Sequence, residues 1–154
     1  MQIIELDNVW FLFIVFIKLG AVMINKKETA KEKSKKFALR IVHLYQYLTN
    51  DKKEFVLSKQ ILRSGTSIGA NLAESGCAIT EKDFLAKVYI ALKETEETLY
   101  WLDLLKESDF IDSKSHSSMF ADCQEIAKML TKTIKTIQNR VQSSEYREQS
   151  SEYR

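Results

Sequence analysis

Proline is absent from this chain of 154 residues, and glycine occurs only at positions 20, 65, 69 and 76. Proline removes a backbone donor and clashes with the preceding helical turn, and glycine weakens helices, so their scarcity favours long helices. Folds rich in strands need frequent turn residues, which this sequence has in few places. We therefore expect an all-α fold, and the length suffices for one domain with its own hydrophobic core.

Helix-start signals divide the chain from residue 25 onward. Asn25 and Glu28 resemble a capping box, and the pattern recurs at Asp51 with Glu54. Gly76 is expected to end the second helix in the left-handed conformation. Residues 81 to 108 should form a third helix about 40 Å long, which begins after a capping threonine at position 80. The polar stretch from 109 to 118 is predicted to be the loop before the fourth helix.

Apolar residues recur at helical spacing in each of these four segments, so each has one face to bury. The inward positions are Phe37, Ile41, Leu44 and Leu48; Ile61, Ile68 and Leu72; Leu85, Val88, Leu92, Thr95, Leu99 and Leu102; and Met119, Cys123, Ile126, Leu130, Ile134, Ile137 and Val141. Short connections between such helices predict an antiparallel up-down-up-down four-helix bundle over residues 25 to 142.

The two ends of the chain differ from the bundle. Residues 9 to 24 read VWFLFIVFIKLGAVMI, an apolar run broken by Lys18. It is shorter than the 20 or so residues of a membrane span and lacks the basic leader of a signal peptide. An anchor, an extension packed on the domain or another subunit, and a natural start at Met23 all stay open. We favour the last, treat residues 1 to 24 as an extra N-terminal apolar segment, and expect a disordered or frayed polar tail over 143 to 154.

The stretch GTSIG at residues 65 to 69 matches G-x-S-x-G, the nucleophile elbow of serine hydrolases. That elbow requires a strand before the serine, whereas the residues before Gly65 continue a helical pattern. Gly65, Gly69 and Ala73 recur every fourth residue and therefore share one helix face. We interpret these three as a helix-packing surface, assign no catalytic role to Ser67, and predict that the protein is not an enzyme.

Metal and cofactor sites are not indicated by the sequence. A di-iron bundle needs Glu-x-x-His pairs, and the required positions before His43 and His116 hold Arg40 and Ser113. The two histidines and two cysteines are not spaced as zinc-ligand pairs. Two distant cysteines suit a reducing compartment. We predict a cytoplasmic protein with no cofactor, no metal, no small-molecule substrate and no membrane partner.

Charge is distributed unevenly although the formal net charge is only +2. Residues 23 to 40 and the fourth helix are basic, whereas residues 81 to 107 are acidic. Basic faces favour a polyanion such as RNA, although solvated surfaces of ordinary kind have the same pattern. The candidate nucleic-acid-binding residues are Lys31, Lys35, Lys36 and Arg40 on the first helix and Lys128, Lys132 and Lys135 on the fourth.

Residues 67 to 105 resemble the S23 family, small bundle proteins encoded in intervening sequences of bacterial 23S ribosomal RNA genes. The resemblance is carried by Ser67, Ile68, Asn71, Leu72, Ala73 and Glu74, and by Lys82, Asp83, Phe84 and Tyr89 to Glu94. It extends less specifically from Phe37 to Ile137. It implies a four-helix subunit that forms a homopentameric ring. One relative, the accessory protein of diversity-generating retroelements, binds nucleic acid and a reverse transcriptase.

Two functional hypotheses follow. The first is a non-enzymatic homo-oligomer, expected to be a pentamer, that binds RNA or a nucleic-acid-associated protein through its first and fourth helices. The second is a protein-interaction scaffold that uses the acidic third helix, with Tyr100 and Trp101 at the interface and no binding of nucleic acid.

Overall fold

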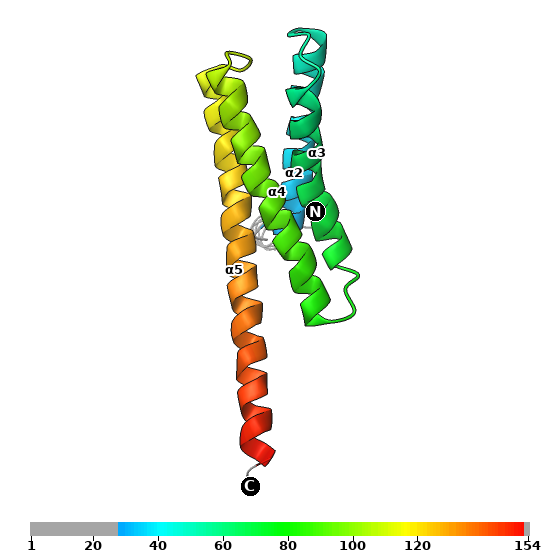
Figure 1. Ribbon diagram of the computed structural model, residues 1–154, viewed down its shortest axis with the longest axis vertical. Helices are drawn as coiled ribbons and strands as arrows, with labels where there is room; N and C mark the ends of the chain where they lie inside the picture. Colours follow the sequence, from blue (N-terminus) through cyan, green and yellow to red (C-terminus); the bar gives the residue numbers. More distant parts are fainter. Residues whose placement is uncertain (1–27, 153–154) are drawn as a thin grey trace, which may run out of the picture.

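The computed structural model describes residues 28–152, and these form four helices (Figure 1). The helices are α2 (Ala30–Asn50), α3 (Leu57–Ser75), α4 (Glu81–Glu107) and α5 (Ser113–Glu152). Consecutive helices pack side by side. The last helix, α5, also contacts α2, and this contact is less extensive than those between consecutive helices. Among the described helices, the diagonal pairs α2–α4 and α3–α5 do not pack directly. This is the predicted antiparallel bundle; the apolar segment 1–24 lies outside the described residues.

The core consists of the inward faces predicted from spacing. All seven predicted positions on α2 and α3 are buried, and so are the α5 positions from Met119 to Ile134. On α4 only half of the predicted positions are fully buried, namely Val88, Thr95 and Leu102, whereas the predicted Leu85, Leu92 and Leu99 are partly buried. The other fully buried positions of α4 are Ala91, Thr98 and Leu105. Buried hydroxyl groups are satisfied locally, as where Thr98 Oγ1 donates to Ser64 Oγ at 3.0 Å. The bundle therefore forms because each helix buries one stripe against its neighbours.

One of the helix starts follows its predicted chemistry, and two are displaced. Asp51 ends α2 and does not cap α3, which begins at Leu57. Thr80 Oγ1 accepts from the Asp83 amide at 3.1 Å, and the carboxylate of Glu54 accepts from the amides that open α3. The first described helix starts at Ala30 with a complete capping box between Thr29 and Glu32, four residues after the expected pair. Asn25 with Glu28 and Thr29 with Glu32 have the same spacing, so the capping-box pattern alone does not predict which pair starts the helix.

The helix ends differ from expectation in three places. Gly76 has φ −67° and is therefore right-handed. The chain continues from it into further turns, in which the amides of Cys77 and Ala78 donate to the carbonyls of Glu74 and Ser75. The α4–α5 connection is short, since Asp112 caps α5 by accepting from the amides of Lys114 and Ser115. Finally, α5 continues to Glu152, into the residues expected to form a disordered or frayed tail. That stretch contains neither proline nor glycine, and extending an existing helix is far easier than starting one.

GTSIG lies within α3, and its glycines face α2. A Cβ atom at Gly65 would lie 2.7 Å from Cγ1 of Ile41, whereas one at Gly69 would lie 3.4 Å from Oγ of Ser34. Close approach of the two backbones therefore depends on Gly65 in particular. Ala73 is exposed, so its assignment to the packing face is corrected.

Candidate nucleic-acid interface

The three predicted lysines of α5 lie together on one exposed face. Lys128, Lys132 and Lys135 are spaced four and three residues apart, and all three line an open groove of about 630 Å³ between α4 and α5. We call this the basic groove; its lining is Glu96, Leu99, Gln124, Ala127, Lys128, Thr131, Lys132, Lys135, Thr136 and Asn139. In the described part of the chain, no carboxylate lies within ion-pair distance of these three ammonium groups. They are available to an anion.

The basic groove adjoins a second depression on the other side of α5. A pocket of about 280 Å³ between α2 and α5 is lined by Glu28, Lys33, Glu125, Lys128, Met129 and Lys132. Lys128 and Lys132 therefore face both depressions. The second depression carries two carboxylates beside its lysines, so its field is weaker than that of the basic groove, which has one.

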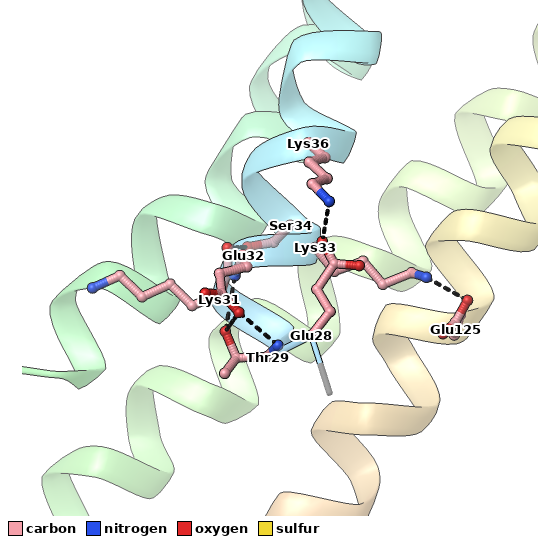
Figure 2. Close-up of polar contacts among 8 residues, drawn as sticks. All are labelled: Glu28, Thr29, Lys31, Glu32, Lys33, Ser34, Lys36 and Glu125. Atoms are coloured by element: carbon pink, nitrogen blue, oxygen red, sulfur yellow. Dashed lines mark hydrogen bonds and ion pairs between the residues drawn. The ribbon is translucent and has the colours of Figure 1, made fainter. Parts of the chain in front are cut away.

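The predicted cations of α2 (Lys31, Lys35, Lys36 and Arg40) do not line either depression with the lysines of α5. Lys36 Nζ lies 2.7 Å from Glu28 Oε1, and this hydrogen-bonded pair raises the pKa of Lys36. Arg40 pairs with Asp122 of α5 and donates to Ser118 Oγ at 2.9 Å. Figure 2 shows Lys31 pointing away from α5, on the opposite side of α2 from Lys33. Half of the predicted basic set on α2 is thus already neutralised.

Lys33 is a cation of α2 that faces α5 and was not among the residues predicted from the sequence. Its ammonium group reaches across to Glu125 of α5 (Figure 2). Lys33 lies beside the buried Ser34, and Arg40 follows Lys33 by seven residues, so both face the same neighbour. That heptad spacing is the signal that could have separated the α5-facing cations from Lys31 and Lys35.

Neither a serine-hydrolase nucleophile elbow nor a metal site is formed by the described residues. Ser67 lies in the middle of the continuous helix α3, which lacks the strand-to-helix turn of a nucleophile elbow. His116 Nε2 contacts Asp103 Oδ1 at 2.8 Å and joins α5 to α4 near their connection. Within residues 28–152 no three metal-ligating side chains gather. Cys77 is exposed, and burial raises the pKa of Cys123 to about 12.

A family model described as 23S rRNA-intervening sequence protein matches residues 26–132. The chain belongs to the 23S rRNA-intervening sequence protein family. The match spans all of α2, α3 and α4 and the part of α5 that carries Lys128 and Lys132. The resemblance inferred from the motifs of α3 and α4 is confirmed.

One crystal structure of a protein with unknown function, from the S23 ribosomal protein family of Bacteroides thetaiotaomicron VPI-5482, is 52% identical to this family member. The similarity covers 70% of this chain and 99% of that one, with a TM-score of 0.69. Comparison with curated proteins finds no match. Within the described helices of this intervening-sequence protein, none combines the length and hydropathy needed to cross a bilayer.

The acidic helix of this intervening-sequence protein carries aromatic side chains of two kinds. Tyr100 is 59% exposed and meets Trp101 edge-on, with ring centroids 5.0 Å apart. Trp101 is half-buried against the core, and its Nε1 donates to Glu97 at 3.2 Å. Arg63 of α3 holds the same carboxylate at 2.7 Å. Of the two predicted interface residues, only Tyr100 presents most of its side chain to solvent.

Proposed function

We propose that this protein is a non-enzymatic, self-associating helical bundle that binds RNA, alone or within a ribonucleoprotein, through the basic groove. One observation carries the proposal: Lys128, Lys132 and Lys135 line one open groove, and no carboxylate of the described residues lies at ion-pair distance from them. The side-chain amides of Gln124 and Asn139 lie among them and can donate to phosphate or ribose oxygens, whereas the hydroxyl groups of Thr131 and Thr136 already donate to backbone carbonyls of α5.

Self-association would strengthen a patch of this size. Three lysines contact few phosphates, so a single subunit should bind weakly at physiological salt. A closed ring repeats the same patch around its axis, and several simultaneous contacts raise the apparent affinity. The pentamer that the family resemblance implies is therefore part of the proposal, and light scattering of the purified protein tests it.

The test is a salt titration of binding to a labelled RNA stem-loop. The variant Lys128→Gln/Lys132→Gln/Lys135→Gln is compared with Lys59→Gln/Lys106→Gln/Lys114→Gln, which removes equal charge from exposed lysines outside the groove. We expect the first variant to weaken binding and to flatten the logarithmic salt slope by about 2 to 3 units per subunit engaged. The control should keep the wild-type slope. Equal effects from both variants would leave the groove without a special role.

A second candidate function is a protein-interaction scaffold, and the exposure of Tyr100 on the acidic α4 favours it. Large exposed aromatic side chains are common anchors of protein interfaces. Tyr100→Ala would then lower the mass of the oligomer or abolish capture of a protein partner. An unchanged oligomer together with intact RNA binding would count against the scaffold.

A further inference from the structure

Two exposed tyrosines of α4 stand along the lip of the basic groove. Tyr89, Lys93, Glu96 and Tyr100 are spaced four, three and four residues apart and are all exposed. Glu96 lines the groove, so Tyr100 one turn later and Tyr89 two turns earlier follow the same lip. Their side chains are 39% and 59% exposed for Tyr89 and Tyr100, respectively.

Contacts between α4 and α5 set the register of this lip against the lysines. The Tyr89 hydroxyl accepts from Gln138 Nε2 at 2.8 Å, and Gln138 is one turn beyond Lys135. Asp103, one turn beyond Tyr100, contacts His116, which precedes Lys128 by about three turns. The two tyrosines therefore lie beyond the two ends of the lysine row. The row from Lys128 to Lys135 spans about 10 Å along α5, and Tyr89 and Tyr100 are about 16 Å apart along α4.

We infer that Tyr89 and Tyr100 are stacking platforms for bases, and that the ligand of the groove is a single-stranded segment of RNA. This inference rests on the proposed function. Lysines on one side of the groove would hold phosphates, and rings on the other side would meet base faces. Proteins that bind single strands combine a basic track with aromatic side chains in this way. A duplex hides its base faces inside the helical stack and offers nothing to such rings.

The hydrogen bond to Gln138 gives Tyr89 a second property of a stacking platform. It fixes the ring across the two helices before any ligand arrives, so little side-chain freedom remains to be lost on binding. Stacking is also tolerant of base identity, since every base has a π-face. We expect a weak sequence preference.

The test compares three RNA probes of equal length: a single strand, the same strand annealed to its complement, and a strand with abasic positions. The variant Tyr89→Leu/Tyr100→Leu removes both rings from exposed helical positions. Tyr89→Phe/Tyr100→Phe keeps the rings and loses only the hydroxyls. The matched control is Tyr47→Leu, which removes an exposed tyrosine of α2, outside the basic groove.

We expect the leucine variant to bind the single strand about tenfold more weakly for each ring lost. Its salt slope should stay unchanged because stacking neutralises no phosphate. Tyr47→Leu should match wild type. The phenylalanine variant keeps both rings and should bind far more tightly than the leucine variant, losing only what pre-ordering of Tyr89 by Gln138 contributes. Wild type should bind the abasic strand and the duplex as weakly as the leucine variant binds the single strand.

Two outcomes separate this inference from the function on which it rests. Full affinity of the leucine variant, or equal affinity of wild type for single strand and duplex, overturns the stacking role. If the lysine variant still loses binding in that case, the proposed function stands without it. Absence of binding to every probe at low salt overturns both.

Discussion

At the scale of single residues, the two glycines of GTSIG form a matched pair for measuring how closely α3 approaches α2. Both lie inside α3, so alanine would gain about 1 kcal/mol of helix propensity at either position. At Gly65 the new methyl group would collide with Ile41, which is fully buried and branched and has no room to move. At Gly69 the nearest atom is at ordinary van der Waals distance.

We therefore expect Gly65→Ala to lower the free energy of unfolding by about 1 to 2 kcal/mol, since overpacking outweighs propensity. Gly69→Ala should leave it unchanged or raise it by up to about 1 kcal/mol. Urea denaturation followed by circular dichroism measures both. Equal stabilisation by the two substitutions would contradict the close packing at Gly65.

The candidate RNA-binding lysines were predictable from the sequence only as far as one helix could be considered alone. Lys128, Lys132 and Lys135 share a face by spacing, and the fold leaves that face open. Whether Lys36 and Arg40 are available depends on Glu28 and on Asp122. The second of these partners is on another helix, and its approach is fixed by tertiary register, which no local pattern contains.

At the scale of helices, Glu54 determines how α3 begins. Its carboxylate accepts hydrogen bonds from the amides of Val56, Leu57 and Ser58, at 2.6 to 2.8 Å. Burial alone would raise the pKa of Glu54. The bonds from the amides outweigh it, so the pKa lies below the ordinary value of 4.5. The charged form therefore stabilises the folded chain above that value, and this stability is lost as the pH falls through the lowered pKa.

Glu54→Gln is expected to lower the free energy of unfolding by about 1 kcal/mol at pH 7, because the cap loses its charge. The difference from wild type should shrink and vanish as the pH falls below the lowered pKa. Denaturation curves between pH 3 and pH 7 test this. Glu107→Gln, an exposed change at the C-terminal end of α4, should show no such loss. A constant difference across that range would rule out a charged cap.

Helix identity was largely predictable because four apolar stripes and the absence of proline leave few other folds. Helix boundaries were less so. Thr29 and Asn25 both precede a glutamate by three residues, and in the described part of the chain the capping box forms at Thr29. Likewise the serine-rich start of α5 has the composition of a loop, yet the cap provided by Asp112 makes it helical.

At the scale of the whole molecule, α2 and α5 close the bundle through its least extensive helix contact, and the cations of α2 at this contact have a structural role. Arg40 joins Asp122 and Ser118 across this contact, whereas Lys132 faces open grooves. Arg40→Gln should lower the free energy of unfolding by about 1 kcal/mol and leave the salt slope of RNA binding unchanged. Lys132→Gln should leave the free energy of unfolding unchanged and flatten the salt slope of RNA binding. Parallel denaturation and binding titrations test this, and matching effects in both assays would disprove the division of roles.

The last helix is longer than the bundle that it completes. Figure 1 shows α5 running beyond the ends of the other three helices. Over residues 113–143, where the structure describes side-chain burial, its last buried core residue is Ile134, followed by the half-buried Ile137 and Val141. Residues 144–154 read SEYREQSSEYR, a polar stretch with no aliphatic side chain to bury. Burial of apolar surface accounts for most helical stability in proteins, so residues after 143 should add little to the folding of the domain.

A chain that ends at Ser143 is therefore expected to unfold within about 0.5 kcal/mol of the full chain. A chain that ends at Thr133 loses Ile134 and the two half-buried residues after it, and should be destabilised by at least about 2 kcal/mol. Urea denaturation of the three chains places the boundary of the cooperative unit. A loss above about 1 kcal/mol at Ser143 would mean that the extension contributes to the fold, because helix propensity alone cannot supply that much.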